Sequence, residues 1–330
     1  MSLAFWRKNA FAMFHREDTM RVHVIEPIDE SAMRKLRAEA EVVAWDDPEK
    51  NDLSRADAVI VRAASVTREQ ILAAPGLKVI GKHGVGVNAI DLVTAKERGI
   101  PVVYTPLSNV NSVAELVFGF ILATARKLRD NMEHIRRGAE RIAPATLTGL
   151  EISGKSLGLV GFGNIGSRVA QIAVNGFGME VHVYDPYMKA ATAKERGVHL
   201  HETLESMLRE ADYISVSVPL TETTRGLIGS AQFACCKPTA VIVSTARGGV
   251  IDESALYEAL ARKTIYGAAS DVFVQEPPTM ENPLLQLPNF IGTLHIGGST
   301  HESLVRVGNT VVDDVLAVLH GEKPLYPYAV

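Results

Sequence analysis

Cysteine is almost absent from this sequence, and the little that is present cannot form a disulfide framework. The two cysteines among the 330 residues, Cys235 and Cys236, are neighbours in the chain. Adjacent cysteines rarely meet the spacing and dihedral angles that a disulfide requires. This usage is typical of a reducing compartment, and we expect a cytoplasmic protein.

Long hydrophobic runs are also missing. No apolar stretch approaches the roughly 20 residues that a membrane-spanning helix needs, so no membrane association is expected. Residues 1–19 mix aromatic, basic and acidic side chains, without a clean apolar segment or an A-x-A-like cleavage site. A signal peptide is therefore not expected. The first strand pattern begins at Arg21, and we interpret residues 1–20 as an N-terminal extension outside the fold.

Neither sign of charge dominates the composition. The formal net charge is −4, which gives no reason to expect a nucleic-acid or anionic-membrane partner. The sequence is 47% hydrophobic and 22% charged, as is ordinary for a globular protein. At 330 residues it exceeds one typical core, which predicts two domains. No metal-ligand spacing such as H-E-x-x-H occurs, so no metal site is expected.

What the sequence does contain is a glycine-rich turn near its middle. The apolar run Leu157–Val160 predicts a buried strand, and a helical pattern begins at Ile165. The residues that join them read Gly161-Phe162-Gly163-Asn164-Ile165-Gly166. A strand, a G-x-G-x-x-G turn and a helix in this order form the dinucleotide-binding fingerprint, in which helix N–H groups face a pyrophosphate.

An acidic residue at the expected distance specifies the nucleotide further. Asp185 ends the next strand pattern, 180–185, and lies 19 residues after Gly166 (166 to 185). A carboxylate at this place accepts hydrogen bonds from the ribose hydroxyls and repels a 2′-phosphate. Pro186 and Tyr187 follow, rather than an arginine that would favour the phosphate. The pattern predicts NAD as the cofactor.

The half of the chain before the fingerprint alternates strand and helix patterns, which predicts a parallel α/β domain. Arg62 and the turn Gly84-Val85-Gly86 follow two of its strands. Ligands bind at the carboxyl ends of such strands. The turn is either a plain tight turn or a set of backbone N–H groups that bind a carboxylate. Arg62 is either a solvated charge or an anion-binding residue.

Three polar residues follow late strands of the second half, where the strand ends of a doubly wound sheet converge. Arg247 follows the strand at 240–244, Glu276 follows that at 265–270, and His295 follows that at 290–294. A histidine can remove the proton of an alcohol during its oxidation, and a carboxylate can orient the imidazole. An arginine can hold a substrate carboxylate. Individually, each could instead have a structural role.

A further segment, Val113–Ala125, is apolar on nearly all sides of its predicted helix. Such a helix should be buried, either between domains or between subunits.

Together these patterns resemble the D-isomer-specific 2-hydroxyacid dehydrogenase family, and most closely its phosphoglycerate dehydrogenase branch. The resemblance covers roughly residues 58–318. Its motifs are Gly84-Val85-Gly86-Val87, Asn109 with Ser112-Val113-Ala114-Glu115, the fingerprint, Pro219-Leu220-Thr221 with Thr224-Arg225-Gly226-Leu227-Ile228, Thr245-Ala246-Arg247-Gly248-Gly249, Asp271-Val272-Phe273 with Glu276-Pro277, and His295-Ile296-Gly297-Gly298-Ser299-Thr300.

The resemblance implies roles for these residues. His295 would be the acid/base, Glu276 its partner and Arg247 a substrate ligand. Arg62, Val85, Gly86, Asn109, Arg247 and His295 would bind the substrate. NAD would be bound by Gly161, Phe162, Gly163, Asn164, Ile165, Gly166, Asp185, Pro186, Val218, Pro219, Thr224, Thr245, Ala246, Arg247, Asp271, His295, Gly297 and Gly298.

It also implies the architecture: two doubly wound parallel-sheet domains, with the active site in the cleft between them. A flavodoxin-like substrate-binding domain would comprise residues 21–107 and 298–330, and a Rossmann NAD-binding domain residues 108–297. The buried helix would belong to the dimer-forming region of the NAD-binding domain, which predicts a homodimer. The regulatory domain of the longer phosphoglycerate dehydrogenases, and feedback by serine through it, is not expected here.

The substrate remains open at this level. 3-Phosphoglycerate and phosphohydroxypyruvate are the leading pair, for which Arg62 with Lys82 or His83 could supply positive charge for a phosphate. Family members that reduce glyoxylate, hydroxypyruvate or other 2-oxo acids share the same motifs. A nucleotide-sensing binding protein or corepressor is the alternative outside catalysis.

Overall fold

The computed structural model describes residues 19–138 and 147–329, so most of the predicted extension lies outside the described residues. The chain separates into two compact units. The first unit comprises Met1–Asn109 and Ser299–Val330, and the second unit comprises Val110–Gly298. Each is described by itself below.

The first unit contains a five-stranded sheet whose strands are all parallel. Its strands in chain order are β1 (Arg21–Val24), β2 (Glu41–Val43), β3 (Ala58–Val61), β4 (Val79–Lys82) and β5 (Val102–Val103). Their spatial order is β2-β1-β3-β4-β5, the order of flavodoxin-like folds. The prediction of a parallel, doubly wound domain is therefore confirmed for this unit.

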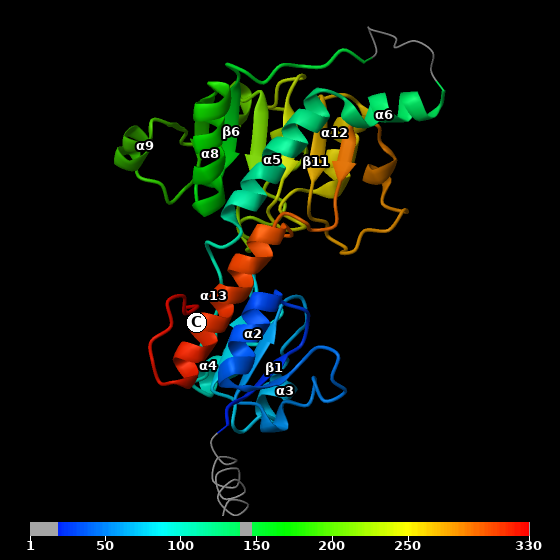
Figure 1. The fold of residues 1–330 in the computed structure, drawn as a ribbon. Helices are drawn as coiled ribbons and strands as arrows, with labels where there is room; N and C mark the ends of the chain where they lie inside the picture. Colours follow the sequence, from blue (N-terminus) through cyan, green and yellow to red (C-terminus); the bar gives the residue numbers. More distant parts are fainter. Residues whose placement is uncertain (1–18, 139–146, 330) are drawn as a thin grey trace, which may run out of the picture. The chain divides into compact units, whose positions relative to one another are not determined.

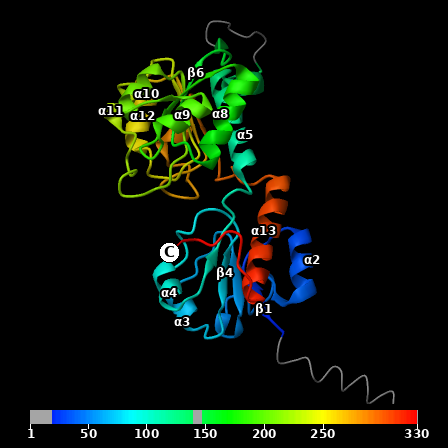
Figure 2. The ribbon, with the colours of Figure 1, turned by 90° about the vertical axis from the view of Figure 1, so that its left-hand side faces the viewer.

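Helices cover both faces of this sheet. Figure 2 shows α2 (Glu30–Glu39) and α13 (His301–Leu319) on one side, with α3 (Arg68–Leu72) and α4 (Leu92–Glu97) on the other. Helix α3 has a well-defined start, because the Thr67 and Gln70 side chains form a capping box.

Helix α13 lies directly on strand β4. A Cβ atom added at Gly81 would lie 2.7 Å from the Val315 Cγ2 atom of α13, so glycine is what allows this close approach. Val311, Val312 and Val315 of α13 are fully buried in the core formed with β1 and α2. The last part of the chain thus completes the core of the first unit.

The second unit contains a seven-stranded sheet, also parallel throughout. Its spatial order is β12-β11-β10-β9-β6-β7-β8, so the order reverses between β6 and β9, as in a Rossmann fold. The strands are β6 (Ser156–Val160), β7 (Glu180–Tyr184), β8 (His199–Leu200), β9 (Tyr213–Val216), β10 (Val241–Ser244), β11 (Gly267–Ser270) and β12 (Phe290–Gly292).

Two hydrophobic cores lie on the two faces of this sheet. One face is covered by α5 and α8, the other by α10, α11 and α12 (Figures 1 and 2). Their bounds are α5 (Val110–Ala125), α8 (Asn164–Phe177), α10 (Leu204–Glu210), α11 (Ser230–Phe233) and α12 (Glu253–Ala261); α6 (Leu128–Arg136) and α9 (Ala190–Arg196) complete the α-helices of the described part.

The apolar helix predicted at Val113–Ala125 is present as α5, which begins three residues earlier, at Val110. Lys127 takes a left-handed backbone conformation (φ 50°) and separates α5 from the charged α6. Nine residues of α5 are buried, including Val117, Phe118 and Ile121. No helix in the parts of the chain that the structure describes is long and apolar enough to cross a membrane.

Candidate active site

The glycine turn after β6 has the backbone geometry that its sequence requires. Gly161 has φ +94°, a region that L side chains rarely adopt. A Cβ atom at Gly166 would lie 2.3 Å from the Gly161 carbonyl oxygen, so helix α8 and the turn pack too closely for any side chain there. The first and third glycines are therefore needed by the fold itself.

The middle glycine leaves the start of α8 open. Gly163 is the N-cap residue, and no side chain caps the helix. A Cβ atom at Gly163 would meet no other atom within 4 Å, so the space beside it is free. The first N–H groups of a helix have no partners within the helix, and the helix dipole favours an anion beside them. This open end fits the pyrophosphate of a dinucleotide, and Asn164 and Ile165 form its first turn.

The carboxylate of Asp185 lies beside this turn. One oxygen accepts the Phe162 N–H at 2.9 Å and the other accepts the Tyr187 N–H at 2.9 Å. Each carboxylate oxygen can accept a further hydrogen bond. Asp185 is thus held in place at the carboxyl end of β7, and Pro186 leads away from it. This arrangement fits a ribose-binding carboxylate.

The loops after β9 and β10 lie on the other side of the glycine turn. The Val218 side chain lies against Gly161, where an added Cβ would come within 2.7 Å of it. The Thr224 hydroxyl donates to the Pro219 carbonyl oxygen at 2.6 Å and accepts the Thr221 N–H at 2.8 Å. Thr224 therefore orders its own loop. Thr245 and Ala246 are buried at the end of β10.

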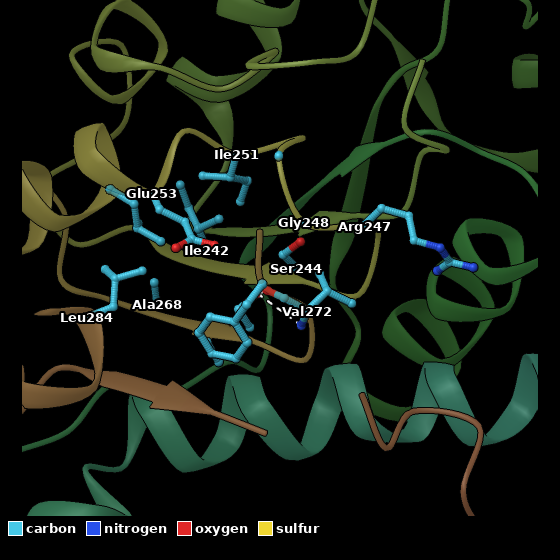
Figure 3. A pocket seen from close by; sticks show the side chains of 14 residues that line it. Ile242, Ser244, Arg247, Gly248, Ile251, Glu253, Ala268, Val272 and Leu284 are labelled. Carbon is cyan, nitrogen blue, oxygen red and sulfur yellow. Dashed lines mark hydrogen bonds between the residues drawn. The ribbon is translucent and has the colours of Figure 1, made fainter. Parts of the chain in front are cut away.

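Arg247 follows directly. Its Nη1 atom donates to the Ala246 carbonyl oxygen at 2.7 Å, and in Figure 3 its guanidinium points away from the cavity that Gly248 and Val272 line. Burial lowers the pKa of Arg247, while the negative charges of Glu276 and Asp271 oppose that shift. An arginine keeps its charge over the physiological pH range. The guanidinium is therefore a permanent cation near two carboxylates.

His295 and Glu276 form a pair in the second unit. The Nδ1 atom of His295 lies 3.0 Å from the Glu276 Oε2 atom, and both side chains are partly exposed. The other Glu276 oxygen accepts the Phe273 N–H at 3.1 Å. With Nδ1 hydrogen-bonded to the carboxylate, Nε2 of the same imidazole is the nitrogen left for a reacting group. The arrangement is suited to proton transfer.

Asp271 holds the turn that carries His295. Its Oδ1 atom accepts the Thr293 hydroxyl at 2.6 Å and the Ile296 N–H at 2.8 Å, and its Oδ2 atom accepts the Gly297 N–H at 2.7 Å. The His295 N–H donates to the Asp271 carbonyl oxygen at 2.9 Å. His295 has φ +53°, unusual for a residue with a side chain.

This role of Asp271 is absent from the sequence-based prediction, which places it among the cofactor-binding residues. The sequence feature that could have indicated this role is an acidic residue directly after the buried strand β11. Gly297 contributes its N–H to the same turn, and Gly298 follows it.

In the first unit, the turn after β4 presents two unused donors. Gly84 has φ +139°, and its carbonyl oxygen accepts the Thr105 N–H at 3.0 Å. The N–H groups of Val85 and Gly86 donate to no acceptor among residues 19–138 and 147–329. Within the same described residues, the buried Oδ1 atom of Asn109 has no hydrogen-bond partner. Both features fit a site for a polar ligand.

Arg62, which follows β3, is an exposed cation of this unit. Its Nη2 atom donates to the Ser299 hydroxyl at 3.1 Å. The Glu26 carboxylate accepts the backbone N–H groups of Arg62, Ala63 and Ala64 and so fixes the loop after β3.

Lys82 and His83, the two residues considered as further sources of positive charge, differ in their charge. The ammonium of Lys82 is buried and donates to the Arg62 carbonyl oxygen. Burial, followed by repulsion from Arg62, lowers the pKa of His83 to about 4. His83 is therefore neutral at physiological pH, which leaves Lys82 as the one of these two residues that could add charge for a phosphate.

The structure thus brings Arg247, Asp271, Glu276 and His295 together in the second unit, at the carboxyl end of its sheet. The residues of the first unit, Arg62, Val85, Gly86 and Asn109, are described within that unit alone. In the described ranges, no group of three or more histidine, cysteine, aspartate or glutamate side chains is placed to hold a metal ion.

Comparison with known proteins shows the family of the chain. Residues 118–297 match the family model described as "D-isomer specific 2-hydroxyacid dehydrogenase, NAD binding domain". The chain belongs to this family. Members of the 2-hydroxyacid dehydrogenase family are oxidoreductases that use a nicotinamide cofactor, and the second unit is the NAD-binding domain.

Individual relatives extend the similarity over nearly the whole chain. A D-3-phosphoglycerate dehydrogenase of Methanocaldococcus jannaschii is 42% identical over 92% of this chain, which spans 58% of that relative's length. A hydroxypyruvate reductase of Thermotoga maritima is 41% identical over 91% of this chain and 98% of its own. The crystal structure of the TT0316 protein of Thermus thermophilus superimposes with a TM-score of 0.86 at 35% identity, covering 94% of this chain and 100% of that one.

Proposed function

We propose that this chain interconverts a D-2-hydroxy acid and its 2-oxo acid with NAD, and that 3-phosphoglycerate and phosphohydroxypyruvate are its leading substrate pair. The observation that carries the proposal is the His295–Glu276 pair beside the Arg247 guanidinium in an NAD-binding domain. The similarity to a D-3-phosphoglycerate dehydrogenase supports the choice of substrate.

His295 is the acid/base of the reaction. In the oxidation direction, its Nε2 atom takes the proton of the substrate hydroxyl; in reduction, it returns the proton to the carbonyl oxygen. Glu276 holds the imidazole through Nδ1 and stabilises the positive charge that develops on it. The nicotinamide, when bound, accepts or supplies the hydride at the substrate carbon.

Arg247 binds the substrate carboxylate and polarises the adjacent carbonyl through charge-assisted hydrogen bonds. Its permanent charge suits this role in both directions of the reaction. In the first unit, the unused N–H groups of Val85 and Gly86 are carboxylate donors, and Arg62 and Asn109 are further substrate ligands.

The cofactor residues surround the glycine turn. The open start of α8 at Gly163 takes the pyrophosphate and Asp185 takes the ribose, which favours NAD over NADP. Strand-end residues from Val218 to Gly298 complete the cofactor site in this proposal, with Thr224 acting through the order of its loop.

Hydroxypyruvate or glyoxylate reduction is the second candidate. It is favoured by the neutral His83 and by Lys82, whose ammonium is used within the fold, because Arg62 is then the remaining exposed cation near the Gly84 turn. A single exposed arginine offers less charge for a phosphate than the sequence suggested. The hydroxypyruvate reductase relative, matched over 98% of its length, points the same way.

Following NADH absorbance with phosphohydroxypyruvate, hydroxypyruvate, glyoxylate and other 2-oxo acids tests the proposal. We expect turnover, and the substrate with the highest kcat/KM decides which of the two candidate reactions the chain catalyses. His295→Ala should remove most turnover while NADH still binds. Turnover with none of these acids would instead favour a nucleotide-sensing binding protein, and near-normal turnover of the variant would refute the acid/base assignment.

We further propose a homodimer that forms through the NAD-binding domain, and a cytoplasmic location. Leu128, Met132 and Ile135 of α6 are each at least half exposed and are spaced to lie on one helix face. Both cysteines are free thiols, as expected in a reducing compartment. Light scattering of the purified chain should give the mass of a dimer. Ile135→Glu should weaken the dimer and shift the measured mass toward that of a monomer.

A further inference from the structure

Glu253 occupies a position between two of the proposed catalytic segments. It is the first residue of α12, which starts shortly after Arg247 and is capped by the Asp252 side chain. Its own side chain turns toward the loop between β11 and β12, and Figure 3 shows it lining the same small cavity as Gly248 and Leu284. Nothing in the proposed reaction uses this carboxylate directly.

Both oxygens of Glu253 bind the loop that carries Glu276. The Oε1 atom accepts the Val274 N–H at 2.6 Å, and the Oε2 atom accepts the Asn282 side-chain amide at 3.1 Å. The Asn282 Oδ1 atom in turn accepts the Leu284 N–H at 3.0 Å. One carboxylate therefore holds the loop near both of its ends.

Few buried apolar side chains order this loop, although the Gln286 side chain also donates to the Met280 carbonyl oxygen at 2.9 Å. Phe273 and Leu284 are buried at its two ends, but every residue from 274 to 283 is exposed or partly exposed. The side chains of Val274 and Met280 are 67% and 74% exposed. A segment with few buried apolar contacts opens easily unless polar contacts hold it. Hydrogen bonds to a charged carboxylate are among the stronger ones available.

From the anchored end, a short series of contacts leads to the imidazole. Val274, held by Glu253, follows Phe273. The Phe273 N–H donates to Glu276 Oε1, and Glu276 Oε2 bonds to His295. The Arg247 turn lies against the same segment, because a Cβ atom at Gly248 would come within 1.9 Å of the Phe273 carbonyl oxygen. The Phe273–Val274 backbone is thus the point where the two catalytic segments meet.

We propose that Glu253 is a positioning residue that holds the loop of residues 273–282 so that Glu276 stays hydrogen-bonded to His295. It acts on the reaction through Glu276 and does not touch the substrate. This inference rests on the proposed function, since it takes the His295–Glu276 pair to be the acid/base machinery.

The test compares Glu253→Ala with Glu258→Ala in the full-length protein. Glu258 lies on the same helix, but its carboxylate pairs with Arg262 at the exposed face, so it is a matched control. We expect Glu253→Ala to lower kcat at least about tenfold, equivalent to about 1.4 kcal/mol, with the KM for NADH nearly unchanged. Glu253→Gln keeps one acceptor oxygen and should lie between Glu253→Ala and wild type. Glu258→Ala should behave as wild type.

A double-mutant cycle separates positioning from general destabilisation. If Glu253 acts through Glu276, adding Glu253→Ala to Glu276→Ala should lower kcat less than about twofold further. A full tenfold further loss would overturn the proposal, as would a kcat unchanged by Glu253→Ala alone.

Amide hydrogen exchange provides a measurement that does not depend on turnover. Peptides covering residues 273–282 should exchange faster in Glu253→Ala, and not in Glu258→Ala. Unchanged exchange would refute the anchoring role even if the wild-type protein proved inactive. Faster exchange with wild-type turnover absent would instead leave Glu253 as the anchor of the loop and refute the proposed function.

Discussion

The buried carboxylate of Asp271 allows a quantitative test of how the His295 turn is held. Asp271 is 2% exposed and accepts hydrogen bonds through both oxygens, from Thr293 and Ile296 on one and from Gly297 on the other. Asparagine at this position has one acceptor oxygen and one amide group. Whichever way the amide is oriented, at least one N–H donor of the turn must face another donor.

The cost follows from these contacts. A hydrogen bond to a charged group contributes about 1.5–3 kcal/mol, and a buried donor left without a partner costs about 1–3 kcal/mol. Because the two terms overlap, we expect Asp271→Asn to lower the free energy of unfolding of the second unit by about 2–4 kcal/mol. The left-handed backbone of His295, which costs on the order of 1–2 kcal/mol, should then relax and lower kcat at least about tenfold.

Urea denaturation followed by far-UV circular dichroism measures the stability, and NADH oxidation measures kcat. Asp252→Asn is the matched control, because both N–H donors at that helix cap go to a single Asp252 oxygen. Asparagine caps a helix as well as aspartate does, so the control should stay within about 0.5 kcal/mol of wild type. Equal stability and equal kcat for Asp271→Asn and wild type would refute this account of the turn.

Two further predictions concern the cofactor and the response to acid. Asp185→Ala should reduce the preference for NADH over NADPH, measured as the ratio of the two kcat/KM values; an unchanged ratio would place discrimination elsewhere. His83 has a folded-state pKa of about 4, below its ordinary value near 6.5, so its contribution to stability is present above pH 6.5 and lost as the pH falls toward 4. That loss should reach up to about 3 kcal/mol, and His83→Gln should flatten the pH dependence of urea unfolding over this window; an equal slope in the variant would contradict it.

Much of the second unit could be predicted from sequence because its signals are local. The turn at Gly161–Gly166 lies between a strand and a helix, and its first and third glycines are required by a backbone angle or contact within a few residues. The parallel sheets followed from apolar runs that alternate with helical patterns. The short edge strand β8 was missed, because two residues carry no periodicity.

Properties that depend on distant neighbours could not be predicted in the same way. The charge of His83 is set by burial and by Arg62, which lies 21 positions earlier (62 to 83). The family resemblance places Asp271 among the cofactor-binding residues, and its sequence position after a strand does not show that it also holds the His295 turn. Only the structure shows that both carboxylate oxygens of Asp271 accept hydrogen bonds from the turn that carries His295. Strand β12 also ends at Gly292, two residues before the end of the strand predicted at 290–294.

The close packing of α13 on Gly81 has a consequence for how the chain folds during its synthesis. All strands and helices of the second unit precede residue 299, so that unit can fold while α13 is still inside the ribosome. The first unit is made earlier but must wait, since Val311 and Val315 fill the core beside β4. Until then part of its apolar sheet face lacks its cover, and the unit whose strands are translated first is completed last.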